Sequence, residues 1–109
     1  MLTRIVKMTF KEEETQNFLN VFEQRKNQIA SFEGCKGVEL LRDISNPNIF
    51  FTYSKWETET YLETYRNSAL FGEVWKTVKK MFSEKAEAWS VTEVWPSSVS
   101  TVINVTFFF

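Results

Sequence analysis

The sequence predicts one α+β domain whose strands and helices follow the order β-α-β-β-α-β. Three observations support this class. Apolar residues alternate with polar ones in several short segments, as is typical of strands. Elsewhere apolar residues recur at helical spacing, and a turn-rich tetrapeptide joins two of the strands. The length of 109 residues also fits a single domain.

The first strand is predicted over residues 2–10, where the apolar face carries a single charge, Arg4. The acidic residues 12–14 then open a helix, because negative side chains suit the positive end of the helix dipole. An apolar stripe at helical spacing follows over residues 18–29. Arg25 interrupts this stripe, and we expect it to form a salt bridge.

Two strands over residues 38–44 and 49–56 are predicted to form a hairpin. The segment 45–48 between them is Ser-Asn-Pro-Asn, which is rich in residues that favour turns. Cys35 lies between two glycines just before this hairpin, so we expect it in a loop. No base is evident near its thiol, which is therefore expected to be unreactive.

A second helical region is predicted in two segments. Thr58 is a suitable N-cap for a short helix that contains Tyr65, and Ser68 could cap a second segment with apolar residues at 3.6-residue spacing. Residues 86–95 are predicted as the fourth strand. Residues 99–109 again alternate and predict an extra C-terminal strand.

This order is the split βαβ arrangement of the ferredoxin-like fold, a sandwich of helices on an antiparallel sheet. We expect the domain to occupy residues 1–95 and a β extension to occupy residues 96–109. Both hairpin strands carry large apolar groups on both faces, although two helices cover only one face. The other face would expose an apolar patch that monomers rarely tolerate. The sequence therefore predicts a homodimer that packs sheet to sheet.

Composition excludes several classes of function. Lys and Arg number 13 against 14 Asp and Glu, which gives no basic surface for nucleic acid. The chain has no histidine and one cysteine, so neither a histidine-ligated haem nor a common zinc or serine–histidine site can form. We expect no metal and no cofactor. Without an apolar run of about 18 residues, no membrane span is predicted, and the expected location is the cytoplasm.

Several blocks of sequence carry a resemblance to a known family. They are Phe-Glu-Gly-Cys-Lys-Gly-Val-Glu-Leu-Leu-Arg-Asp at 32–43, Phe-Phe-Thr-Tyr-Ser at 50–54 followed by Trp56, and Tyr-Arg-Asn-Ser at 65–68 followed by Phe71. In order and spacing they resemble the antibiotic biosynthesis monooxygenase family over about residues 2–94. The resemblance implies a ferredoxin-like protomer that dimerises through its sheet into an α+β barrel. It also implies several activities. Some members oxygenate polycyclic phenols or quinols without metal or flavin, one branch degrades haem, and others have isomerase activity or no known activity.

The haem-degrading branch is similar in carrying an Asn on the first strand, with a Trp and an axial His on the second helix. At the two helix positions this sequence holds Tyr65 and Trp75, and residues 2–10 contain no Asn. All three residues of that branch are missing, so haem degradation is rejected.

The resemblance and the helical stripe together predict a substrate cavity between the second helix and the sheet. Its predicted substrate-binding residues are Trp56, Thr52, Phe71 and Trp75. For Trp56 the alternative is a core tryptophan at the end of a strand. For Trp75, as for Tyr65, the alternative is ordinary core packing, because an aromatic stripe at helical spacing is usually core.

Tyr65 and Arg4 are the predicted catalytic residues, since either could hydrogen-bond a substrate oxygen and stabilise its anion. A charge on an apolar strand face is costly unless it is paired, and functional sites accept such costs. The alternative for Arg4 is a position at a sheet edge with the guanidinium reaching water.

Two functions remain open at this point. The first is a cofactor-independent monooxygenase that oxidises a flat phenol or quinol with dioxygen, using an apolar, water-poor pocket. The second is a non-catalytic small-molecule-binding or dimeric interaction module of the same fold. A core closed by Tyr65 and Trp75 would favour the second.

Overall fold

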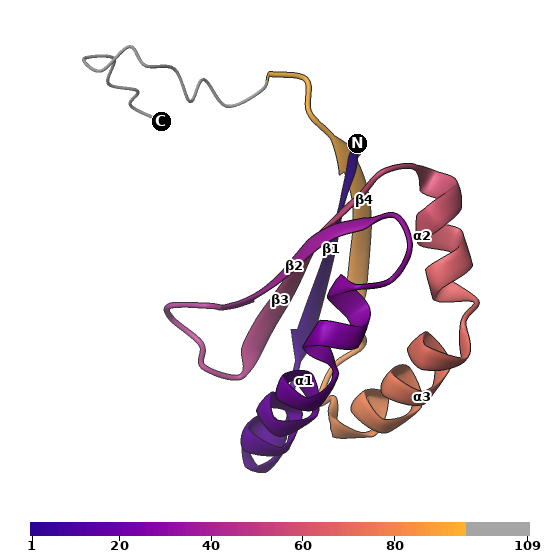
Figure 1. The fold of residues 1–109 in the computed structure, drawn as a ribbon. Coiled ribbons are helices and arrows are strands. Elements are labelled where there is room, and N and C mark those ends of the chain that lie inside the picture. The colour runs from indigo at the N-terminus through magenta and orange to yellow at the C-terminus, as the bar shows by residue number, and fades with distance from the viewer. Residues whose placement is uncertain (96–109) are drawn as a thin grey trace.

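A four-stranded antiparallel sheet with its α-helices on one side forms the fold (Figure 1). The computed structural model describes residues 1–95. Its strands are β1 (Leu2–Thr9), β2 (Cys35–Arg42), β3 (Ile49–Trp56) and β4 (Glu87–Thr92). Its helices are α1 (Thr15–Ala30), α2 (Glu59–Arg66) and α3 (Ala69–Val78), with short 3-10 turns η1 (Glu12–Glu14) and η2 (Lys79–Met81).

The strand order in the sheet is β2-β3-β1-β4, and each neighbouring pair is antiparallel. This arrangement confirms the predicted ferredoxin-like α+β fold. The predicted extra strand and the β extension of residues 96–109 lie outside the described residues.

Several element boundaries differ from the predictions. β1 ends at Thr9, the acidic residues 12–14 form the 3-10 turn η1 ahead of α1, and β2 ends at Arg42. The fourth strand ends at Thr92, three residues earlier than expected. Cys35 is the first residue of β2 and not part of a loop. The pairing of β2 with β3 shifts register between Cys35 and Gly37, where Gly37 has a φ of 146°. A bulge therefore lets the strand begin early, and glycine supplies the backbone conformation that it needs.

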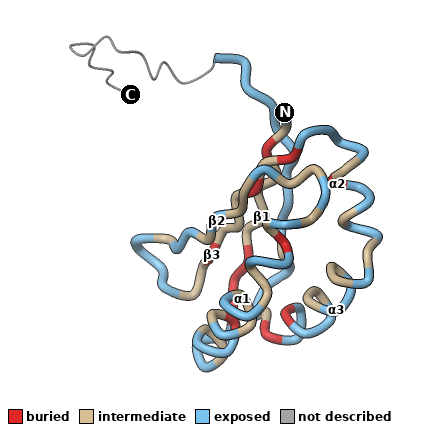
Figure 2. The backbone as a smooth tube through the Cα atoms, in the orientation of Figure 1, coloured by how far each residue is buried: buried red, intermediate tan, exposed pale blue. Residues whose placement is uncertain are grey.

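Side chains from the sheet and from two helices meet in the main core. Its buried members are Met8, Phe10, Phe18, Phe50, Val78 and Met81. The rings of Phe10 and Phe18 stack with centroids 4.2 Å apart, which packs α1 against the residue that follows β1. In Figure 2 the buried segments follow the central strands and the end of α3, where the sheet and the helices face one another.

The sheet face away from the helices is largely apolar. In one row across it, Ile5 is paired with Tyr53 on one side and with Trp89 on the other. Trp89, Leu41 and Val91 keep 44%, 46% and 44% of their surface exposed. Charged residues share this face, since Glu39 continues the same row beside Tyr53 and Lys7 lies next to Phe51. The predicted apolar second face is therefore present in part.

No helix within residues 1–95 is both long enough and apolar enough to cross a membrane. The cytoplasmic location stays a prediction.

Candidate functional site

The break between α2 and α3 positions the site. The Thr58 side chain accepts a hydrogen bond from the backbone N–H of Tyr61 at 3.3 Å, and Ser68 accepts one from Phe71 at 3.1 Å. Both predicted N-caps are thus confirmed. Ser68 has an extended backbone, so one helix must stop before it and a second helix starts after it. The two short helices then lie on the same side of the sheet as α1 (Figure 1).

A continuous chain of aromatic rings runs under these helices. Trp56 stacks on Tyr65 with ring centroids 5.0 Å apart. Tyr65 meets Phe71 edge to face at 5.3 Å, and Phe71 stacks on Trp75 at 5.8 Å with an interplanar angle of 9°. The fold therefore brings together four of the residues that the sequence predicted for the site.

This aromatic chain separates two cavities. The larger, of about 270 Å³, lies towards β1 and β4 and is lined by Arg4, Tyr65, Phe71 and Trp75 among others. The smaller, of about 90 Å³, lies over β2 and β3. Because Ser54 and the three aromatic residues line both cavities, they form the wall between them. Tyr65 and Trp75 therefore do not close the core completely.

Trp56 and Thr52 lie beside the smaller cavity and do not line the larger one. Trp56 is fully buried, and its indole N–H donates to Ser54 Oγ at 3.0 Å. Tyr65 stands between the Trp56 ring and the larger cavity. In this arrangement Trp56 supports Tyr65 from behind, as a core residue does.

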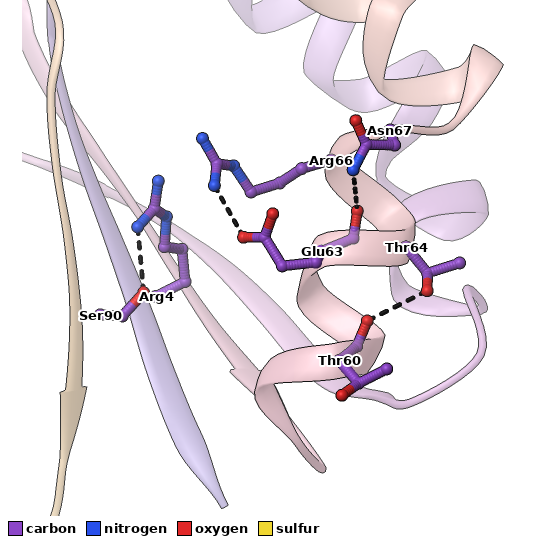
Figure 3. Close-up of polar contacts among 7 residues, drawn as sticks. All are labelled: Arg4, Thr60, Glu63, Thr64, Arg66, Asn67 and Ser90. Carbon is purple, nitrogen blue, oxygen red and sulfur yellow. Dashed lines mark hydrogen bonds and ion pairs between the residues drawn. The ribbon is translucent and has the colours of Figure 1, made fainter.

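Arg4 is the charged residue that β1 contributes to the larger cavity. β1 lies between β3 and β4, so the alternative of a sheet-edge position for Arg4 is wrong. Its Nη1 donates to Ser90 Oγ on β4 at 3.0 Å (Figure 3). Burial, followed by the positive charge of Arg66, lowers the pKa of the Arg4 guanidinium, and Glu63 opposes this shift. The guanidinium still carries its charge at neutral pH.

Tyr65 lines both cavities and carries a phenolic hydroxyl. Burial, and then the nearby Cys35, raise the pKa of Tyr65 to about 12. The hydroxyl is therefore protonated at neutral pH, where it can donate a hydrogen bond and cannot serve as a base.

Sequence reasoning missed several residues of the larger cavity. Arg66 lines it from the last turn of α2, and Ala86 and Ala88 line it from the β4 side. Spacing could have indicated Arg66, since Leu62, Tyr65 and Arg66 share one helix face at positions i, i+3 and i+4. Within residues 1–95, no group of three or more His, Cys, Asp or Glu side chains is placed to hold a metal ion.

A family model for antibiotic biosynthesis monooxygenases matches residues 1–77. The chain belongs to the antibiotic biosynthesis monooxygenase family. No curated protein matches the sequence of this chain.

Solved structures of similar fold agree with this assignment. Several of them carry the name "putative antibiotic biosynthesis monooxygenase". The one from Nitrosomonas europaea is 18% identical, with a TM-score of 0.80, and the match covers 87% of this chain and 100% of the other. The one from Bordetella bronchiseptica is 25% identical, with a TM-score of 0.78 and coverage of 86% and 97%. A conserved protein from Methanosarcina mazei Go1 is 23% identical, with a TM-score of 0.78 and coverage of 84% and 91%.

Proposed function

We propose that this protein is a cofactor-independent monooxygenase that oxidises a phenol or quinol of one or two rings with dioxygen. The observation that carries the proposal is the larger cavity, where aromatic walls meet the side chains of Arg4, Arg66 and Tyr65. A dry cavity of about 150 Å³ holds a benzene molecule. The larger cavity, of about 270 Å³, therefore suits one or two fused rings.

Arg4 and Tyr65 act on the substrate oxygen in this proposal. The positive charge of Arg4 favours the phenolate over the phenol, and the Tyr65 hydroxyl donates a hydrogen bond to the same oxygen. The rings of Phe71 and Trp75 hold the substrate plane by offset stacking, worth about 0.5–1.5 kcal/mol per contact.

The reaction needs only the substrate and dioxygen. The phenolate passes one electron to dioxygen, and the resulting phenoxyl radical and superoxide combine at a ring carbon. The peroxide takes up the proton that the phenol lost. Elimination of water, with the hydrogen of that carbon, leaves a quinone, so one oxygen atom enters the product and the other becomes water. The smaller cavity gives dioxygen an apolar space beside this ring, behind Tyr65 and Phe71.

One observation favours the second candidate, a non-catalytic binding module. The described residues that line the larger cavity include no carboxylate and no thiol that could remove the substrate proton. In a monooxygenase of this kind, the proton must therefore leave to water as Arg4 stabilises the anion.

Oxygen consumption distinguishes the two candidates. An oxygen electrode should record uptake above the uncatalysed rate with one-ring or two-ring quinols. Arg4→Gln should lower that rate by about 100-fold, as the loss of a charge-stabilising donor does elsewhere. Arg25→Gln is the control, because Arg25 pairs with Glu73 at 3.5 Å and does not line the larger cavity. No uptake with any quinol, or equal rates for the two variants, would replace the enzyme with the binding module.

We also propose that the protein is a homodimer through its open sheet face. The support is the apolar row around Ile5 and Trp89, which a second copy would bury. Light scattering at micromolar concentration should give twice the chain mass of 12.9 kDa. Trp89→Glu should shift the protein towards monomer. Ile44→Glu should not, because Ile44 is fully exposed in the hairpin loop, beyond the end of β2. A monomeric wild type would refute the proposal.

A further inference from the structure

Arg66 gives the larger cavity a second guanidinium. It is the last residue of α2, and its side chain extends from the helix towards Arg4 on β1 (Figure 3). Both arginines line the cavity, although they are 62 positions apart in the sequence. Two positive groups on facing walls repel each other, so the fold has to hold them there.

The positive charge of this pair is only partly neutralised. Arg66 Nη1 lies 2.8 Å from Glu63 Oε1, one turn earlier on α2. The partner of Arg4 is the neutral hydroxyl of Ser90, and among residues 1–95 Arg4 has no ion pair. Two guanidiniums against one carboxylate leave one net positive charge at the mouth of an aromatic cavity.

A guanidinium has five N–H donors, and the contacts just described use few of them. The free donors of Arg66 are available to a ligand, and a planar guanidinium matches a carboxylate through two parallel hydrogen bonds. The ring of such a ligand would reach the wall formed by Tyr65, Phe71 and Trp75.

We propose that the larger cavity selects an aromatic ring that carries a carboxylate beside its hydroxyl. Arg66 binds the carboxylate, Arg4 lies between the carboxylate and the phenolic oxygen, and the aromatic wall holds the ring. The proposal rests on the proposed function for the reaction that follows binding, but the selectivity itself is a property of binding.

A matched pair of ligands tests this selectivity. 1-Hydroxy-2-naphthoate and 1-naphthol share the ring and the hydroxyl and differ only in the carboxylate. By calorimetric titration, the full chain should bind the naphthoate at least about tenfold more tightly, as expected for a charge-assisted hydrogen bond. The preference should weaken as salt is added, because part of the site is open to solvent.

Variants of the arginines assign the effect. Arg66→Gln should remove most of the preference for the naphthoate, while Arg66→Lys should keep part of it. The matched control is Arg25→Gln, which removes the same charge from another arginine paired with a glutamate on the surface. Glu63→Gln should strengthen naphthoate binding, because it frees Arg66 from its carboxylate partner. Circular dichroism checks that each variant folds.

The outcomes separate this proposal from the proposed function. Equal affinity of the wild type for both ligands, or equal effects of Arg66→Gln and Arg25→Gln, would overturn the carboxylate selectivity. Oxygen uptake with a carboxylate-free quinol at the same efficiency as with its carboxylated analogue would also overturn it, while leaving the monooxygenase intact. Carboxylate-selective binding without any oxygen uptake would support the selectivity and refute the monooxygenase.

Discussion

Replacing Gly34 with alanine tests how the loop before β2 holds α2 against the sheet. Gly34 has a φ of +85°, and a Cβ atom there would lie 2.2 Å from Tyr61 Cγ on α2. Its carbonyl also accepts a hydrogen bond from the Glu57 backbone N–H at 2.8 Å. The position therefore needs glycine for its backbone conformation and for space.

The two effects give the expected magnitude. A left-handed backbone costs an L-residue roughly 1–2 kcal/mol. Overpacking against a ring held by its helix costs about 1–3 kcal/mol more. Gly34→Ala should thus lower the free energy of unfolding by roughly 2–5 kcal/mol. A domain of this size loses about 4 °C of Tm per kcal/mol.

Denaturant and thermal unfolding, followed by circular dichroism, measure the loss. Gly72→Ala is the control, because a Cβ at Gly72 meets no atom within 4 Å inside α3. That change should stabilise the protein by about 0.4–1 kcal/mol. Since α2 carries Tyr65 and Arg66, Gly34→Ala should also weaken ligand binding. A Gly34→Ala protein within about 0.5 kcal/mol of wild type would refute the packing argument.

Three further predictions concern the walls of the two cavities. The pKa of Tyr65 is raised from its ordinary value of 10.0 to about 12 in the fold. The contribution of Tyr65 to stability is therefore complete below pH 10 and is lost as the pH rises towards 12. Denaturant titrations at pH 9 and 11.5 should show a loss of about 1.8 kcal/mol that Tyr65→Phe lacks, and parallel curves would contradict this. Ala88→Leu should fill part of the larger cavity and weaken ligand binding at least about tenfold, equivalent to 1.4 kcal/mol, whereas Ala69→Leu, outside the cavity lining, should not. Trp56→Ala should cost about 3–5 kcal/mol of stability in urea unfolding, because the fully buried ring and its bond to Ser54 are both lost, and a near-neutral effect would show that Trp56 is not core.

Local patterns explain why the elements could be predicted. Alternation placed Arg4 on the helix-facing side of β1, and the structure places it there because each strand residue points opposite to its neighbours. Thr58 and Ser68 were correct as N-caps since capping depends on residues three apart in the chain. The early start of β2 at Cys35 was missed, because two glycines read as a loop also permit a bulge.

The sequence by itself determined the fold class, the apolar second face of the sheet and the aromatic character of the space under α2 and α3. Only the tertiary structure decided which ring faces which cavity. Tyr65 covers Trp56 and leaves it in the core, and Arg66 comes opposite Arg4. Both results depend on the angle at which α2 crosses the sheet. Tyr61 on α2 lies close against Gly34, and the chain breaks between the two helices at Ser68. Periodicity along one segment carries no information about such contacts between two segments.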